Sequence, residues 1–178
     1  MSSHSTNPLL ASVKQFNAQH QIKHALVIGD VMLDRYLIGS VGRISPEAPV
    51  PIVLLNQQNE RAGGAANVAA NLALLGIKTH IIGCIGQDNE GATLTSLLKE
   101  MDVDASGIYI SDNRPTIAKT RVLSGHQQML RLDQESNTNF NAEENAGLMA
   151  IIQEQLRLKP SIVILSDYAK GLLSEQTC

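Results

Sequence analysis

The sequence has little cysteine and no excess of basic side chains. Its two cysteines, one in an apolar run at Cys84 and one at the last position, Cys178, form neither a disulfide framework nor a zinc ligand set. The chain carries 14 lysine and arginine residues against 17 aspartate and glutamate residues, a net charge of -3. We therefore expect reduced thiols, and no nucleic-acid partner, because a surface that binds nucleic acid is basic.

Long apolar runs are also missing. No run reaches the roughly 20 residues that span a bilayer, and the polar start MSSHSTNPLLASV lacks the charged-then-apolar order of a signal peptide. We expect a cytoplasmic protein without a membrane partner. With 178 residues, of which 43% are hydrophobic, the chain is long enough for one domain, or most of one, with a buried core.

Three common enzyme motifs and a metal site are not supported either. The chain contains no G-x-G-x-x-G, no P-loop G-K-[ST] and no G-x-S-x-G. These absences disfavour a nicotinamide-dependent enzyme, a P-loop NTPase and an α/β-hydrolase. His20 and His24 have the spacing of helical metal ligands, but His24 opens a strand-like segment, so we expect no metal site there.

Helical and strand-like patterns alternate along most of the chain. Such alternation predicts a largely parallel sheet that is covered by helices. The expected helices are 8–21, 65–75, 90–101 and 142–158, and the expected strands are 25–28, 79–85 and 161–165.

Two segments, about 34–60 and 116–133, interrupt this alternation with strand-like patterns of their own. The second changes direction at a turn around Ser124 and Gly125, and prolines in the first favour an edge strand or a loop entry. We expect these segments to form a second, smaller sheet.

Charged residues follow the first and the last predicted strands, where parallel sheets bind ligands. Asp30 and Asp34 come after the first strand, and Asp167 and Lys170 after the last. A carboxylate at Asp34 would suit adjacent sugar hydroxyls, and Lys170 would suit an anion. The same residues are also typical of turns, caps and solvated loops, so both interpretations stay open here.

A glycine doublet, Gly63 and Gly64 in RAGGAANVAANLALLG, marks a predicted helix start with Asn67 in its first turn. The glycines would let backbone N–H groups approach a ligand, or would simply allow close packing of an alanine-rich helix. A similar pair of interpretations applies to Lys119, Arg121 and Arg131. They would bind a phosphate or would only make a β-ribbon soluble.

Six stretches together carry a family resemblance: GDVMLDRY, GRISPEAPVPIV, RAGGAANVAANLALLG, IGCIGQDNEG, RVLSGHQQMLRLD and LSDYAKG. They resemble the ribokinase (PfkB) family of sugar kinases, and within it the N-terminal kinase domains of the heptose kinase/adenylyltransferases of lipopolysaccharide synthesis. The resemblance implies an α/β ribokinase-like fold, with a Rossmann-type parallel sheet and a small β lid that serves in homodimerisation. It also implies phosphorylation of D-glycero-β-D-manno-heptose 7-phosphate at O1, with ATP and Mg²⁺.

The same resemblance implies a set of substrate-binding residues. Sugar hydroxyls would be held by Asp34, Gly63, Gly64 and Asn67, and the sugar phosphate or its neighbourhood by Arg131, Asp167 and Lys170.

The second signature of the family, a G-A-G-D stretch with the catalytic aspartate, does not occur in these 178 residues. We therefore expect residues 1–178 to be the N-terminal half of a kinase domain, inactive by itself, with an apolar sheet edge exposed. Two alternatives stay open: a PfkB kinase for another substrate, such as fructose phosphate or adenosine, and a non-catalytic sugar-binding or dimerisation fragment.

Overall fold

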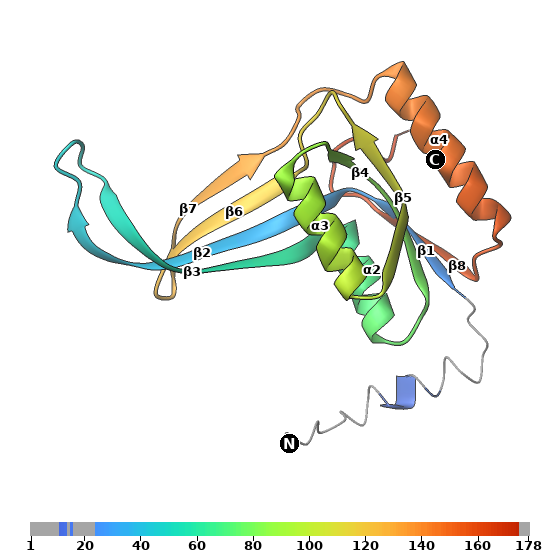
Figure 1. Cartoon of the computed structure of the whole chain (residues 1–178), viewed down its shortest axis with the longest axis horizontal. Helices are drawn as coiled ribbons and strands as arrows, with labels where there is room; N and C mark the ends of the chain where they lie inside the picture. Colours follow the sequence, from blue (N-terminus) through green and yellow to red (C-terminus); the bar gives the residue numbers. More distant parts are fainter. Residues whose placement is uncertain (1–10, 14, 16–23, 175–178) are drawn as a thin grey trace.

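Two four-stranded sheets organise the protein, which a computed structural model describes over residues 11–13, 15 and 24–174 (Figure 1). The first sheet is parallel, with strand order β5-β4-β1-β8, and the second has the order β3-β2-β6-β7. The parallel strands are β1 (Ala25–Gly29), β4 (Thr79–Gly86), β5 (Val103–Ser111) and β8 (Ile162–Ser166). The expected parallel sheet and the expected second sheet are both confirmed.

Helices cover both faces of the parallel sheet. Helices α2 (Ala65–Leu74) and α3 (Asn89–Glu100) lie on one face, and α4 (Ala142–Arg157) lies on the other (Figure 1). Side chains alternate between the faces along a strand, so Val27 joins the core under α2 and α3 while Leu26 joins the core under α4. Burial on both sides explains the continuous apolar runs of β1 and β4.

The predicted helix 8–21 lies mostly outside the described residues, as does His20. Within the ranges that the structure describes, no helix has the length and hydrophobicity needed to cross a membrane.

Strand β5 was not predicted from the sequence. Its segment VDASGIYIS has no continuous apolar run, because the strand lies at the edge of the sheet and its burial is mixed. Pairing with β4 makes it a strand, and Gly107 allows the close approach: a Cβ there would lie 2.7 Å from the carbonyl oxygen of Ile81. Tertiary pairing therefore decided this element.

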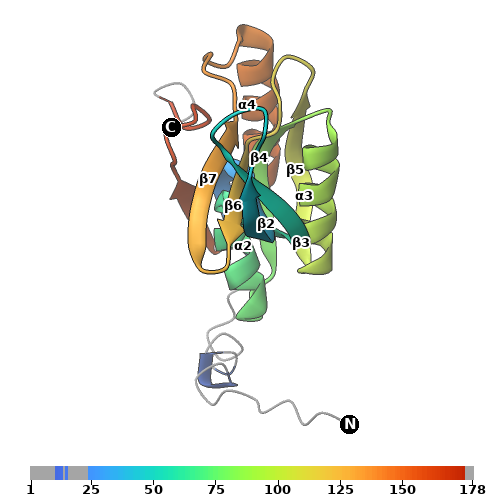
Figure 2. The same ribbon diagram turned by 90° about the vertical axis from the view of Figure 1, so that its left-hand side faces the viewer.

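The second sheet, which we call the lid, projects from the parallel sheet. Figure 2 looks at the lid from its tip and shows β7, β6, β2 and β3 side by side. Its strands are β2 (Val31–Ile44), β3 (Pro51–Gly64), β6 (Ala118–Ser124) and β7 (Gln127–Gln134). Two of the prolines lie in the loop 45–50 and the third begins β3, which agrees with the expected edge or loop entry.

Polar contacts attach the lid to the rest of the protein. Arg35 of β2 donates through Nε to Glu60 of β3 at 2.7 Å and through Nη1 to Glu90 of α3 at 3.2 Å. Asp88, the N-cap of α3, accepts the backbone N–H of Thr116 at 2.8 Å and its hydroxyl at 2.6 Å. Burial raises the pKa of Asp88, but the hydrogen bonds that its carboxylate accepts lower the pKa by more. The net pKa of Asp88 therefore lies below its usual value.

Candidate functional site

The GDVMLD and AGGAAN stretches meet where the parallel sheet joins the lid. The chain passes from β1 through Asp30 directly into β2, and β3 runs back through the glycine doublet into α2. The two lid strands are antiparallel, with Val31 opposite Gly64 and Met32 opposite Gly63. Segments that are about thirty residues apart in the sequence thus lie side by side at this junction.

Asp34 lies inside lid strand β2, in agreement with the expected lid segment 34–60. The strand begins three residues before Asp34, because β2 starts one residue after Asp30 and leaves no loop between the two sheets. Its carboxylate contacts the backbone at Gly63, where any Cβ would collide with Asp34 Oδ2 and would lie 2.9 Å from Met32 Cγ. Glycine at this position therefore leaves room for the Asp34 carboxylate in its observed place, and a larger residue would displace it.

Gly64 has a separate structural role. Its φ of 58° lies in the left-handed region that favours glycine, and a Cβ there would collide with the carbonyl oxygen of Asp30. That same oxygen accepts the N–H of Ala65 at 2.9 Å, which starts α2 against β1. Gly64 therefore shapes the helix entry, and Gly63 makes room for Asp34.

The first turn of α2 lacks a side-chain cap among the described residues, and it contains no acidic residue. Asn67 is exposed in that turn, and its side chain has no hydrogen-bond partner in the described part of the chain. A helix N-terminus with uncapped N–H groups favours oxygen atoms of a ligand.

Asp30 is a buried anchor for the loop that follows β8. Its Oδ2 accepts the backbone N–H groups of Tyr168 and Lys170, each at 3.0 Å, and its Oδ1 accepts that of Leu172 at 3.2 Å. The residue is 3% exposed. Asp30 accepts backbone N–H groups, as a capping residue does, but they belong to a loop about 140 residues away in the sequence and not to a turn after β1.

The two predicted residues of that loop have different environments. Asp167 is exposed and accepts the N–H of Ala169 at 2.7 Å, which stabilises the turn. Lys170 is partly buried, and its Nζ donates to Glu135 Oε1 at 2.8 Å, just beyond the end of β7. The loop therefore brings Lys170 to the lid, whereas Asp167 makes no hydrogen bond to another predicted site residue in the described ranges.

The predicted basic residues share one face of the lid. Arg131 is exposed on β7 and donates to Asp133 through Nε at 2.8 Å and through Nη2 at 2.9 Å. It lies opposite Arg121 on β6, and Arg121 donates through Nη1 to Asp34 Oδ1 at 2.5 Å. Asp34 thus stands on the same face as these arginines, at the junction with the glycines.

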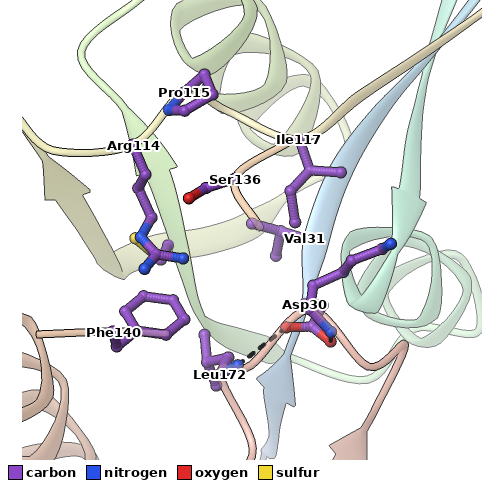
Figure 3. Close-up of a pocket in the computed structure, with 10 residues that line it drawn as sticks. Asp30, Val31, Arg114, Pro115, Ile117, Ser136, Phe140 and Leu172 are labelled. Carbon is purple, nitrogen blue, oxygen red and sulfur yellow. Dashed lines mark hydrogen bonds between the residues drawn. The ribbon is translucent and has the colours of Figure 1, made fainter. Parts of the chain in front are cut away.

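A small cavity of about 20 Å³ lies beside this junction (Figure 3). It is lined by Asp30, Arg114, Phe140 and Leu172 among others, and the Arg114 guanidinium carbon lies 3.6 Å from the Phe140 ring centroid. The volume suits a water molecule rather than a sugar. Burial raises the pKa of Cys84, which also lines the cavity, to about 12, so its thiol stays protonated and is no nucleophile.

Among the described residues, no group of three or more histidine, cysteine, aspartate or glutamate side chains is arranged to hold a metal ion. We assign none of the described residues to Mg²⁺.

A family model for pfkB carbohydrate kinases matches residues 22–170. The chain belongs to the pfkB family of carbohydrate kinases. The fold also resembles other kinases of known structure. A carbohydrate kinase from Agrobacterium tumefaciens aligns with a TM-score of 0.61 over 80% of this chain and 45% of its own, at 20% identity. A fructokinase from Halothermothrix orenii aligns with a TM-score of 0.51 over the same shares, at 21% identity.

Two sequence relatives are more similar to this chain. The bifunctional protein HldE of Methylobacillus flagellatus is 59% identical over 164 residues, which are 90% of this chain and 34% of that protein. The bifunctional protein HldE of Magnetococcus marinus is 50% identical over 158 residues, 88% of this chain and 32% of that protein. The chain thus spans about a third of the length of these relatives.

One residue, Arg121, was not included in the predicted site, although it contacts Asp34. Arg121 was recognised only as part of a basic strand face, because the alternating pattern gives the face of a residue but not its neighbour. The parallel pairing of β2 with β6 places Tyr36 beside Arg121, and the Arg121 side chain then reaches Asp34. No local sequence signal indicates this pairing.

Proposed function

We propose that this chain is the sugar-binding and lid part of a kinase that phosphorylates D-glycero-β-D-manno-heptose 7-phosphate at O1, with ATP and Mg²⁺, to the 1,7-bisphosphate. The observation that carries the proposal is the 59% identity, over 90% of this chain, to the bifunctional protein HldE of Methylobacillus flagellatus. Because the chain spans 34% of that relative, the activity of the whole protein is itself part of the proposal.

The geometry at the lid junction supports a sugar site. The Asp34 carboxylate would accept hydrogen bonds from adjacent hydroxyls, and the absent side chain at Gly63 makes room for that carboxylate. Gly64 would set the approach of α2, and the exposed Asn67 in the first turn of α2 would contact a further hydroxyl. These four residues come from β2, β3 and α2, so a ligand there would lie between the lid and the parallel sheet.

The phosphate of the substrate would meet the basic face of the lid. Arg131 would face the phosphate from β7, and Lys170 reaches the lid from the loop after β8. Asp167 belongs to the same loop and would lie near the phosphate. In the structure, Arg131 is paired with Asp133 and Lys170 with Glu135. A phosphate dianion would compete with these carboxylates for the same donors.

Phosphoryl transfer requires positioning of the reactants and stabilisation of the transferring group. The family signature that supplies both, G-A-G-D, does not occur in the 178 residues. ATP would supply the phosphoryl group, and we assign no residue of this chain to its binding. We therefore propose that the 178-residue polypeptide binds the sugar phosphate without turning it over.

Homodimerisation through the lid belongs to the same proposal, as does a cytoplasmic location, where ATP is available. Leu130 and Leu132 lie on one face of β7 and are 48% and 54% exposed. Exposed leucines at alternate positions of a strand favour a partner surface. Sedimentation of the wild type and of Leu132→Lys tests this point: a wild-type monomer at micromolar concentration would contradict it.

Calorimetric titration of the 178-residue chain with heptose 7-phosphate, fructose 6-phosphate and adenosine tests the substrate. We expect heptose 7-phosphate to bind at least about tenfold more tightly than either competitor, because a site built for specific hydroxyls rejects ligands that lack them. Tighter binding of fructose 6-phosphate or adenosine would favour another pfkB kinase. Folded protein without affinity for any of the three would overturn the sugar-binding role, and robust ATP-dependent turnover would overturn the proposed inactivity.

A further inference from the structure

Three cationic residues lie close to Asp34 in the lid, and within the described residues one of the three, Arg121, donates a hydrogen bond to its carboxylate. Arg61 lies opposite Asp34 on β3, and Lys119 lies opposite it on β6. Lys119 donates instead to Asp133 at 3.1 Å, and the Arg61 guanidinium carbon lies 5.7 Å from the Tyr36 ring centroid. Within the described residues, the hydrogen bond to the Asp34 side chain comes from Arg121.

The two oxygens of this carboxylate face different neighbours. Oδ1 accepts from Arg121 Nη1 at 2.5 Å, whereas Oδ2 points to the space that a Cβ at Gly63 would occupy. Among the residues that the structure describes, Oδ2 accepts no hydrogen bond, so its acceptor capacity remains for a ligand. The side chains of Arg121 and Asp34 are 23% and 20% exposed, so a ligand can still reach the pair.

Arg121 is itself held in place. Its guanidinium carbon lies 5.3 Å from the Tyr36 ring centroid, within the range of a cation–π contact. The hydrogen bond to Asp34 raises the pKa of Arg121 above its usual value, so the donor stays charged at any physiological pH. Tyr36 and Asp34 are alternate residues of β2, and Arg121 contacts both from β6.

We propose that Arg121 is a positioning residue for Asp34. Its guanidinium fixes the carboxylate against Gly63, so that ligand hydroxyls meet an acceptor that is already oriented and lose less entropy on binding. The inference rests on the proposed function in one respect, because it takes Asp34 as the acceptor for sugar hydroxyls. A lysine would offer a point charge in place of the planar N–H group and would replace Arg121 only in part.

Calorimetric titration of single and double variants tests this role, with heptose 7-phosphate and the unphosphorylated heptose as probes. Arg121→Met keeps most of the aliphatic length and removes the donors, and we expect it to weaken both ligands about tenfold. Arg121→Lys should recover part of that loss. The matched control is Arg43→Met, which removes one positive charge from an exposed position of β2 and should bind like the wild type.

The double variant separates positioning from direct contact. If Arg121 acts through Asp34, then Asp34→Ala/Arg121→Met should bind no more weakly than Asp34→Ala alone. A further loss in the Asp34→Ala background, or a loss confined to the phosphorylated ligand, would mean that Arg121 acts on the ligand itself and would overturn the proposal. Wild-type affinity of Arg121→Met would overturn it as well.

A second cycle on the ligand-free protein separates this inference from the proposed function. If the folded wild type bound no heptose 7-phosphate, the proposed substrate would be wrong. The contact between Asp34 and Arg121 would still be tested by urea unfolding of the wild type, the two single variants and the double variant. Coupling between Asp34→Ala and Arg121→Met in the free energy of unfolding would support a held carboxylate. Additive effects would overturn it.

Discussion

Replacing Asp30 by asparagine tests how the loop after β8 is held at the junction of the two sheets. The carboxylate accepts three backbone N–H groups, two at Oδ2 from Tyr168 and Lys170 and one at Oδ1 from Leu172. An asparagine can keep its oxygen toward the first two groups. Its NH₂ group then faces the N–H of Leu172, so that two donors meet in a buried place.

The expected loss follows from these three contacts. A hydrogen bond to a charged group contributes about 1.5–3 kcal/mol, and a buried N–H left without a partner costs about 1–3 kcal/mol. Asp30→Asn loses one such bond and weakens the other two, so we expect the free energy of unfolding to fall by about 2–4 kcal/mol. Relief from burying a charge offsets part of the cost, which is why we do not expect the full sum.

Urea unfolding followed by circular dichroism measures this change, and trypsin adds a local readout because it cleaves after Lys170. We expect faster cleavage there in Asp30→Asn than in the wild type, since the loop is released before the core unfolds. Asp112→Asn is the matched control, because it removes the same charge from an exposed position. Equal stability and equal cleavage rates for Asp30→Asn and the wild type would refute the anchoring role.

Three further predictions concern other parts of the protein. Gly63→Ala should displace the Asp34 carboxylate, destabilise the fold by about 1–3 kcal/mol and weaken heptose 7-phosphate binding at least about tenfold; calorimetry showing unchanged affinity would contradict this. Burial raises the pKa of Glu144, but hydrogen bonds led by that from the Ser111 hydroxyl bring it below the usual 4.5, so its stabilisation is present above about pH 4.5 and is lost as the pH falls through the lowered pKa. Glu144→Gln should therefore show a shallower acid decline in thermal melts between neutral pH and pH 3, and an unchanged slope would count against it. Strand β8 is an edge of the parallel sheet with an exposed Val163, and such an edge favours aggregation. Val163→Lys should therefore reduce aggregation, and light scattering equal to that of the wild type would disprove that the β8 edge causes the aggregation.

Much of the fold was accessible from local patterns. The continuous apolar runs of β1 and β4 predicted buried parallel strands, and helical spacing predicted α2, α3 and α4 with boundaries within one residue. The strand-like patterns in 34–60 and 116–133 predicted the lid, although the lid begins three residues earlier, at Val31. Strand β5 was missed because its strand character depends on pairing with β4.

The candidate site was predicted in part. The strand-end rule identified Asp30 and Asp34 and the motifs identified the glycine doublet, but neither indicated that Asp30 holds a loop about 140 residues away or that Asp34 lies against Gly63. The sequence did not indicate Arg121 as the partner of Asp34, since 87 residues separate the two.

By itself, the sequence determined the class of fold, the two sheets and the family, because each depends on residue types at short, regular spacings. The tertiary structure alone decided which residues meet. Strand register puts Gly63 beside Asp34, the pairing of β2 with β6 brings Arg121 to its carboxylate, and Asp30 accepts hydrogen bonds from a loop about 140 residues away. Such contacts depend on how distant strands pair, and a spacing within one segment carries no information about that register.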